Sequence, residues 1–518
     1  MLVMVRLATL GIILAPIGCS PLEAQDRREP FPGLDAYVTK VMATWRVPGL
    51  SIAVVRNDSV VYAKGYGVRT IGGNQPVDEH TLFAIGSSGK AFTATLAAML
   101  VSDGKLRWDD RVAVHVPGFR LYDAYANSEL TIRDALTHRS GLSRGELVWA
   151  GSGLSKDEVL RRLRFLPPTW SFRSRFGYSN IMYLAAGEAA ARAAGSTYND
   201  LIRQRILTPL GMTMTLVDPE TVADQGNIAT AHSRLDDTTY TKPFWLAHNI
   251  VPAGMIVSNA RDMAEWIRFQ LADGQHNGKR LLSSAAFRET HRPQTIISGG
   301  RDDDDEAGRH FTTYGIGWFV QDYNGRLVWQ HGGNTDGMTA MVAMLPEQEF
   351  GVVVLSNMAG SPAPNALARY LFDRHLNAPP RDWSAEAYER SRRGDRADSL
   401  AKARAASRIA GGRPPFPLEA YVGAYTDSLY GDLSVTIEQG RLAIERGQWH
   451  GPLEYWNGNT FRWNVAGSPG ALEPFFFVRF DATPEATVNR VSFGLPGEVA
   501  SFARKPKDRP SPVGQGTR

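Results

Sequence analysis

The stretch Phe83-Ala-Ile-Gly-Ser-Ser-Gly-Lys-Ala-Phe-Thr-Ala-Thr-Leu-Ala-Ala-Met-Leu100 passes from a short apolar run into a strongly helical pattern. Ser87 lies at this transition, and Lys90 follows three residues later, so one helical turn brings the hydroxyl and the amine to the same face. A serine hydroxyl needs a base at neutral pH, and a lysine can be that base only if burial or nearby cations keep it neutral. A Ser-Xaa-Xaa-Lys spacing also arises by chance about once or twice in a chain of this length. The prediction of an activated serine therefore depends on what accompanies the motif.

The composition is typical of a soluble globular protein with room for more than one domain. The chain has 518 residues, of which 43% are hydrophobic and 21% charged. Its net charge of +4 is small beside 57 basic and 53 acidic side chains, and no dense Lys/Arg stripe is interleaved with aromatic residues. We therefore expect a small-molecule or peptide substrate and no nucleic-acid partner, and the oligomeric state is left open.

The first 24 residues have the pattern of an export signal. An apolar core runs from Leu7 to Ile17, and Leu22-Glu-Ala24 is a tolerable cleavage site. That core is too short to predict a membrane span. The single cysteine, Cys19, offers a second interpretation as a lipoprotein cleavage site, although the residues before it match poorly. We expect a periplasmic or secreted protein without disulfides, with a lipid anchor at Cys19 as the alternative.

Two further motifs contain residues that could take part in catalysis, but neither is specific evidence for an active site by itself. Tyr178-Ser-Asn180 comes just before an alanine-rich helical pattern, where a tyrosine is usually a packing residue. His331-Gly-Gly-Asn334 lies between two strand-like runs. Its glycines would let a ligand approach the backbone, and its histidine can accept or donate a proton. A simple turn without a functional role fits the same residues equally well. Two strand-like runs, Pro48–Val55 and Ser59–Gly65, are joined by Asn57-Asp58 and predict a hairpin. Four further runs at hairpin spacing predict an antiparallel sheet, and these are Tyr314–Val320, Leu327–Gln330, Met338–Leu345 and Gly351–Leu355.

A competing motif, Gly141-Leu-Ser-Arg-Gly145, fits the nucleophile elbow of a different hydrolase fold, with Ser143 as the nucleophile. That elbow needs a strand before the serine and a helix after it. Here the pattern predicts a helix over Leu130–Leu142 before the serine, and Pro167-Pro168 soon follows. We therefore favour Ser87 over Ser143.

The last quarter of the chain reads as a separate unit. Residues 379–416 are rich in Arg, Ala, Ser and Asp and predict a charged helical linker. Residues 417–505 predict a small all-β sandwich or barrel, and residues 506–518 a disordered tail. The strand-like runs of the β-domain are Tyr421–Tyr425, Leu433–Ile437, Leu442–Ile444, Phe461–Asn464, Pro474–Phe480 and Val488–Phe493.

Taken in order, Ser87-Ser-Gly-Lys90, Tyr178-Ser-Asn180 and His331-Gly-Gly333 make the chain resemble the penicillin-recognising serine hydrolases. Within them it resembles the branch of class C β-lactamases, serine D-peptidases and β-lactamase-like esterases. The resemblance spans roughly residues 33–376, which places a hydrolase domain over 25–378, and the β-domain is similar to one appended to some members. It implies an α+β fold, with an antiparallel sheet flanked by helices, an all-helical lobe, and the active site in the cleft between them.

The resemblance also implies how the catalytic residues act. Ser87 would attack a carbonyl and become acylated, while Lys90 and Tyr178 would share the proton, with the base not assigned to either one. An ammonium at Lys90 would depress the pKa of the Tyr178 phenol. Water would then hydrolyse the acyl-enzyme, and no metal or organic cofactor is implied.

The remaining site residues would bind the substrate. Asn180 would orient a substrate amide or hold the catalytic lysine, and the backbone N–H groups of Ser87 and Asn334 would form the oxyanion hole. His331 and Gly333 would contact the substrate. Typical β-lactamases carry a lysine where this chain has His331, and a largely neutral histidine suits a substrate carboxylate less well. We therefore expect an ester or a D-residue-containing peptide or amide, with three alternatives: a class C-like β-lactamase, an acyl transferase, and a non-catalytic binder of penicillin or cell-wall ligands.

Overall fold

The computed structural model describes residues 30–506, apart from residues 143, 236–237, 244–246, 300–308, 393–407, 409–410, 466–474, 486 and 496. The predicted export signal, the alternative lipid anchor at Cys19, the competing Ser143 and nearly all of the predicted tail lie outside the described residues. None of the helices in the described ranges has the length and apolar character needed to cross a bilayer.

An antiparallel sheet of eight strands forms the centre of the N-terminal domain, in the order β2-β1-β14-β13-β12-β11-β10-β9. Its first strands pair with its last, because Leu50 of β1 lies opposite Ser356 of β14. The two ends of this domain therefore meet in one sheet. The strands are β1 (Gly49–Arg56), β2 (Ser59–Gly67), β9 (Thr295–Gly299), β10 (Phe311–Tyr314), β11 (Phe319–Tyr323), β12 (Arg326–Thr335), β13 (Met338–Leu345) and β14 (Phe350–Ser356).

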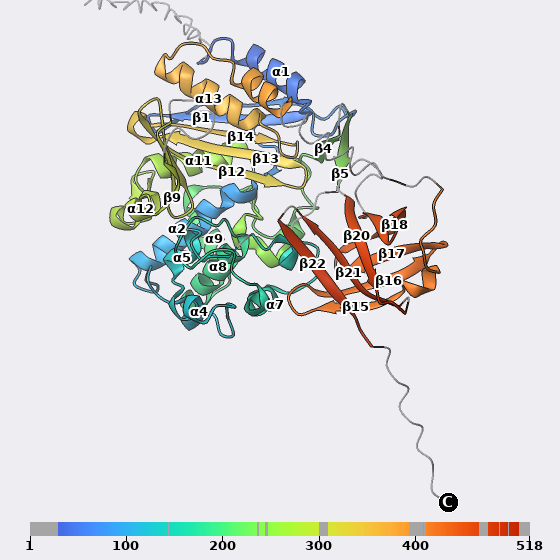
Figure 1. Ribbon diagram of the computed structural model, residues 1–518. Coiled ribbons are helices and arrows are strands. Elements are labelled where there is room, and N and C mark those ends of the chain that lie inside the picture. The colour runs from blue at the N-terminus through green and yellow to red at the C-terminus, as the bar shows by residue number, and fades with distance from the viewer. Residues whose placement is uncertain are drawn as a thin grey trace, which may run out of the picture.

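Alternate residues of the central strands face two separate hydrophobic cores. On β1, Ile52 and Val54 pack into the core beneath α1 (Leu34–Trp45) and α13 (Ala363–Leu376), whereas Ala53 and Val55 face the opposite core. Strands buried on both faces read as unbroken apolar runs, which is why these segments were recognisable in the sequence. Figure 1 shows α1 and α13 on one side of the sheet and α11 (Ala260–Leu271) and α12 (Ser284–His291) on the other.

The helical lobe lies on the α11 side of the sheet and is built around α2 (Lys90–Ser102), which is buried along nearly its whole length. Phe92 of α2 stacks on Trp266 of α11, with ring centroids 3.9 Å apart, so the helix that follows Ser87 is joined directly to the sheet layer. The other helices of this region are α3 (Val112–His115), α4 (Ala124–Glu129), α5 (Ile132–Leu136), α6 (Glu146–Trp149), α7 (Lys156–Arg162), α8 (Asn180–Ala194), α9 (Tyr198–Ile202) and α10 (Thr208–Leu210). Among the residues described for this domain there are also three small two-stranded sheets: β3 (Phe83–Ala84) with β6 (Val257–Ser258), β4 (Ala231–Leu235) with β5 (Thr238–Lys242), and β7 (Gln275–His276) with β8 (Lys279–Arg280).

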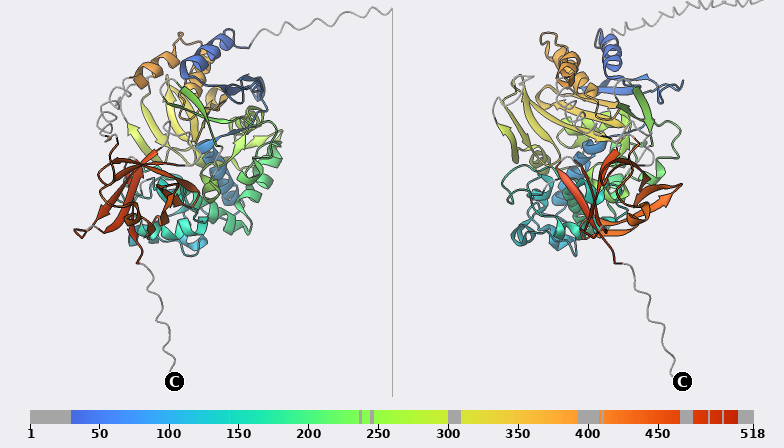
Figure 2. Two further views of the ribbon diagram at one scale, coloured as in Figure 1. Left: turned by 90° about the vertical axis from the view of Figure 1, so that its right-hand side faces the viewer. Right: turned by 45° about the vertical axis from the view of Figure 1, so that its right-hand side comes forward.

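The C-terminal region is a closed barrel of eight strands, which confirms the predicted small β-domain and identifies it as a barrel. It closes because β15 pairs with β22, where Tyr425 lies opposite Arg504. Both views of Figure 2 show the barrel lying against the helical lobe and away from α1 and α13. Two strands, β18 and β22, were not predicted. The strands are β15 (Gly423–Asp427), β16 (Gly431–Glu438), β17 (Arg441–Arg446), β18 (Trp449–Asn457), β19 (Thr460–Asn464), β20 (Phe475–Ala482), β21 (Val488–Leu495) and β22 (Glu498–Arg504).

Two strand predictions in the N-terminal domain were wrong in their boundaries. The run Tyr314–Val320 is not one strand, because β10 ends at Tyr314 and the chain turns before β11. Gly317 has φ +85°, a conformation that favours glycine, and the N–H of Gly315 closes the turn onto the carbonyl of Trp318 at 2.8 Å. The segment His331–Asn334 is not a turn, because β12 continues through it to Thr335.

The described start of the predicted linker packs against the N-terminal domain. Trp383 is 3% exposed, and its indole N–H donates to a carboxylate oxygen of Asp373 on α13 at 2.6 Å. Lys40 of α1 pairs with Asp382 at 2.6 Å. The linker prediction overlooked these contacts because one tryptophan in a charged stretch carries no periodic signal.

The stacked pair between α2 and α11 gives a test of the fold. We expect Trp266→Ala to lower the free energy of unfolding by about 3–5 kcal/mol, because it removes a large, fully buried ring. The matched control is Tyr122→Ala, whose ring is 62% exposed and whose loss should change stability by no more than about 0.5 kcal/mol. Urea unfolding followed by circular dichroism measures both, and equal effects would contradict the assigned packing.

Candidate active site

Ser87 lies in a single 3-10 turn, Gly86–Gly89, between β3 and α2. This turn is pressed against the end of β12 and against the segment after Ala253. Gly86 has φ +51°, and a Cβ there would lie 2.7 Å from the backbone nitrogen of Asn334. A Cβ at Gly254 would lie 2.1 Å from the carbonyl oxygen of Gly86. Glycine at these two positions therefore lets three separate segments converge on Ser87.

The amine of Lys90 lies at the centre of these segments. Its Nζ is 3.0 Å from Ser87 Oγ, 2.7 Å from Asn180 Oδ1 and 2.6 Å from the carbonyl oxygen of Ala253. The side chain has no exposed surface, and this burial lowers the pKa of Lys90 well below its usual value. The structure thus favours a neutral amine beside the serine hydroxyl.

Tyr178 completes the contacts of the serine, because its hydroxyl donates to Ser87 Oγ at 2.7 Å. Burial raises the pKa of the Tyr178 phenol well above its usual value. We expected an ammonium at Lys90 to depress this pKa, and the structure gives the opposite direction. The reason is that both groups are buried, so each favours its uncharged form.

Asn180 connects the amine to a carboxylate that the sequence analysis missed. Its Oδ1 accepts from Lys90, and its Nδ2 donates to Glu146 at 3.1 and 3.2 Å. Arg144 donates to the same carboxylate at 3.0 Å, and its guanidinium lies 5.0 Å from the ring centroid of Tyr178. The Glu146 charge raises the pKa of Lys90 and the Arg144 charge lowers it, both less strongly than burial acts. No spacing rule connects Arg144 or Glu146 to the three motifs.

His331 lies behind the site rather than at its surface. The ring is 1% exposed; its Nδ1 lies 2.7 Å from the carbonyl of Gly332 and its Nε2 lies 3.1 Å from the hydroxyl of Tyr314. Burial, aided by the Lys90 charge, lowers the pKa of His331 to about 3. The side chain is therefore neutral, as expected, but the structure does not support the predicted contact between its side chain and a substrate.

A second histidine, which the sequence analysis did not single out, extends this buried layer. His138 has no exposed surface, and its Nδ1 accepts from the N–H of Ser179 at 3.1 Å. Its ring centroid is 4.4 Å from that of Tyr178 and 4.8 Å from that of Tyr314. Burial lowers the pKa of His138 well below its usual value, so the wall behind Tyr178 is uncharged. Among the described residues, no group of three or more His, Cys, Asp or Glu side chains could hold a metal ion.

The two glycines after His331 were expected to let a ligand approach the backbone, but the structure shows a different use for Gly333. A Cβ there would lie 1.8 Å from the carbonyl oxygen of Ile85 and 3.1 Å from the backbone nitrogen of Ser87. Gly333 is buried by the chain itself, whereas the next residue, Asn334, is exposed. The backbone nitrogens of Ser87 and Asn334 thus lie on two segments in direct contact.

Comparison with known proteins places this geometry in a family. The Beta-lactamase family model matches residues 34–376, which is more than half of the chain and contains all three motifs. This chain belongs to the beta-lactamase family. A second family model, described as a domain of unknown function (DUF3471), matches residues 407–506, the region of the barrel.

Relatives in this family include named hydrolases and penicillin-binding proteins. Unguisins hydrolase ungD of Aspergillus violaceofuscus is 28% identical over 466 residues, which cover 83% of this chain and 79% of that protein. Penicillin-binding protein 4 of Amycolatopsis lactamdurans is 29% identical over 323 residues, which cover 60% of this chain and 81% of that protein. The octameric penicillin-binding protein homologue from Pyrococcus abyssi has the same fold, with a TM-score of 0.60 and 21% identity over 90% of this chain and 99% of that one. The predicted family and fold class are thus confirmed, and the family consists in general of serine hydrolases.

Glu146 and Arg144 act in opposite directions on the pKa of Lys90, and this allows the site to be tested by the pH dependence of its reactivity. A neutral Lys90 is needed to accept a proton, so the rate at which Ser87 reacts with a fluorophosphonate should fall as the pH falls through the pKa of Lys90. Glu146→Gln removes the charge that raises this pKa and should move the fall to lower pH. Arg144→Gln removes a charge that lowers the pKa and should move the fall to higher pH.

The control for this test is Arg120→Gln, which changes an exposed arginine elsewhere on the lobe and should leave the profile unmoved. If the pH profiles of Glu146→Gln and Arg144→Gln shift in the same direction, or if neither profile shifts, the pH dependence does not come from Lys90.

Proposed function

We propose that this protein is a serine hydrolase that forms an acyl-enzyme on Ser87 and acts on an ester or a D-residue-containing peptide or amide. The observation that carries the proposal is the pair of contacts to Ser87 Oγ, from the buried Lys90 amine at 3.0 Å and from the Tyr178 hydroxyl at 2.7 Å. A protein that only binds ligands has no need for a desolvated amine against a serine hydroxyl.

Lys90 is the base for the attack. A neutral amine has two N–H groups and one lone pair, and two of its three contacts, Asn180 Oδ1 and the Ala253 carbonyl, can only accept hydrogen bonds. The lone pair is therefore left for the hydroxyl proton of Ser87. As Oγ bonds to the substrate carbonyl carbon, that proton passes to Lys90, and the carbonyl oxygen becomes an oxyanion.

Tyr178 delivers the proton to the leaving group. Its raised pKa keeps the phenol protonated, and it contacts the same Oγ that becomes bonded to the substrate. When the leaving group takes the Tyr178 proton, the ammonium of Lys90 can restore it. Water then attacks the ester carbonyl and gives a proton to the same pair. As the bond between the carbonyl carbon and Oγ breaks, Oγ takes a proton back from the pair, which restores the free serine hydroxyl.

The oxyanion is held by the backbone N–H groups of Ser87 and Asn334. The close approach of Gly86 to Asn334 and of Gly333 to Ser87 keeps these two donors on adjoining segments. Fixed donors of this kind supply a large share of the rate enhancement in acyl transfer.

The neutral ring of His331 supports an ester or D-peptide over a β-lactam. Where typical β-lactamases carry a permanent cation, this chain has a buried and uncharged imidazole. The alignment with unguisins hydrolase, which covers 83% of this chain, supports hydrolysis over binding alone.

Intact-mass spectrometry with a fluorophosphonate and with a penicillin tests the proposal. We expect one fluorophosphonate adduct on the wild type and none on Ser87→Ala. Tyr178→Phe keeps the ring but loses the proton donor and should lower the labelling rate by about 10²- to 10⁴-fold.

The penicillin result separates the alternatives. A long-lived penicilloyl adduct is expected of a peptidase-like enzyme, and rapid release of hydrolysed penicillin would indicate a β-lactamase. Wild-type protein that forms no adduct with either reagent would overturn the enzyme proposal in favour of a binding protein.

A further inference from the structure

Helix α6, which carries the Glu146 carboxylate of the site, is only four residues long, from Glu146 to Trp149. So short a helix has little stability of its own and leaves polar backbone groups unpaired at each end. The residue before it is Gly145, with φ +59°, which has no side chain to cap the helix. The groups that hold α6 must therefore come from elsewhere in the fold.

The N-terminal end of α6 is bound by a residue of the C-terminal barrel. The backbone N–H groups of Glu146 and Leu147 donate to the two carboxylate oxygens of Glu498, at 2.8 and 3.0 Å. Glu498 is the first residue of β22 and lies about 350 positions further along the chain. A carboxylate at this end of a helix is favoured by the helix dipole as well as by the two hydrogen bonds.

The C-terminal end of α6 is bound by Arg446, the last residue of β17. Its guanidinium donates to the carbonyl oxygens of Leu147 and Ala150, and also to that of Tyr430 within the barrel. Arg446 is 1% exposed and lies about 6 Å from three barrel aromatic rings. A barrel anion and a barrel cation thus hold opposite ends of the same short helix.

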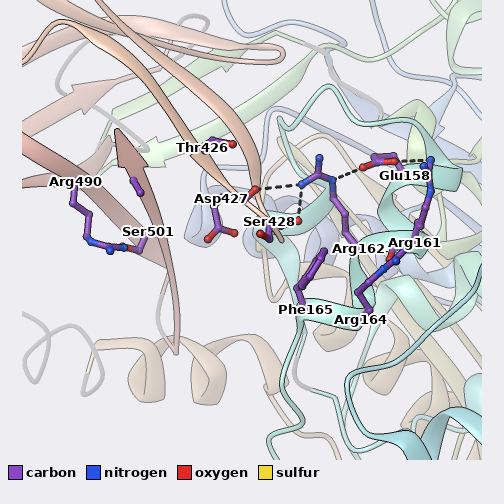
Figure 3. A pocket seen from close by; sticks show the side chains of 11 residues that line it. Glu158, Arg161, Arg162, Arg164, Phe165, Thr426, Asp427, Ser428, Arg490 and Ser501 are labelled. Carbon is purple, nitrogen blue, oxygen red and sulfur yellow. Dashed lines mark hydrogen bonds and ion pairs between the residues drawn. The ribbon is translucent and has the colours of Figure 1, made fainter. Parts of the chain in front are cut away.

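The surrounding backbone fits the barrel closely. A Cβ at Gly151 would lie 2.1 Å from the ring of Trp449, and one at Gly447 would lie 2.4 Å from the backbone nitrogen of Gly153. A neighbouring contact is seen in Figure 3, where Arg162 of α7 donates to the barrel carbonyls of Asp427 and Ser428, at 3.3 and 2.6 Å. The interface therefore leaves α6 little freedom to shift.

From these contacts we infer that Glu498 and Arg446 are positioning residues for the chemistry at Ser87. The inference rests on the proposed function, and it gives the barrel a role in the reaction beyond covering the lobe. The connection is continuous: Glu498 holds the backbone of Glu146, the Glu146 carboxylate holds the Asn180 amide, and Asn180 Oδ1 holds the Lys90 amine.

The charged residues at this interface indicate that the barrel orients α6 and does not only attach to the helical lobe. Burying a guanidinium costs free energy that apolar side chains would not, and such groups add little stability unless their geometry is good. Hydrogen bonds to particular backbone carbonyl and N–H groups fix both the rotation of α6 about its axis and its position along that axis. Apolar contacts alone would fix neither. A displacement of about 1 Å at the Lys90 end would suffice to lower the rate substantially.

The test is a double-mutant cycle on the full-length protein, with the rate of fluorophosphonate labelling of Ser87 as the readout. Glu498→Gln keeps the shape but places an amide N–H₂ against a backbone N–H, and we expect it to slow labelling by about 10- to 100-fold. The matched control is Glu445→Gln on the same barrel, an exposed position that should change the rate by less than about twofold. In a Glu146→Ala background, which lacks the carboxylate that accepts from Asn180, Glu498→Gln should have less than about a threefold further effect, because it acts through that carboxylate.

Circular dichroism and the unfolding midpoint establish that each variant is folded. Arg446→Lys, which keeps the charge but cannot reach all three carbonyls, provides a second variant at the other end of α6, with the exposed Arg441→Lys as its control. A folded Glu498→Gln or Arg446→Lys that labels at the wild-type rate would overturn the inference, as would an undiminished effect of Glu498→Gln in the Glu146→Ala background. Absence of labelling in the wild type would instead refute the proposed function.

Discussion

Removal of the Lys90 amine from water is the physical constraint on which the rest of this site depends. A buried amine without a directly bonded carboxylate favours its neutral form, and only the neutral form can take the proton of Ser87. Asn180 fits this requirement because its neutral amide lies between Lys90 and Glu146. Its Oδ1 accepts from the amine and its Nδ2 donates to the carboxylate, so no charged group is bonded directly to Lys90. The uncharged layer of His138 and His331 behind Tyr178 adds no competing cation.

The fold meets this constraint by bringing three parts of the chain to one point. The sheet contributes the end of β12, the lobe contributes the first turn of α2 and the start of α8, and the barrel holds α6. Each contribution is a backbone segment fixed by glycine contacts or by hydrogen bonds, so the side chains at the site have little freedom. Under the proposed positioning role of Glu498 and Arg446, the barrel belongs to the framework of the candidate active site, in a region whose matching family model carries no known function.

The sequence allowed the family, the fold class and the residues around Ser87 to be predicted, because their signals are local. Ser87 and Lys90 are three residues apart, and Tyr178 lies two residues before Asn180, the first residue of α8. Glu146 and Glu498 could not be found in this way, because they meet across about 350 residues and neither follows a spacing rule. The burial of His331 was also not readable, because the position in β12 gives no sign that Tyr314 covers the ring.

The most direct test of this account is the titration of Lys90 itself. In protein labelled with ¹³C in its lysine side chains, one lysine signal should change between ammonium and neutral amine at a pH well below that of the other lysines, because burial lowers the pKa of Lys90. That signal should be missing from Lys90→Arg. If every lysine instead titrates near the usual value of 10.5, Lys90 is charged in the free protein and cannot be the base for Ser87.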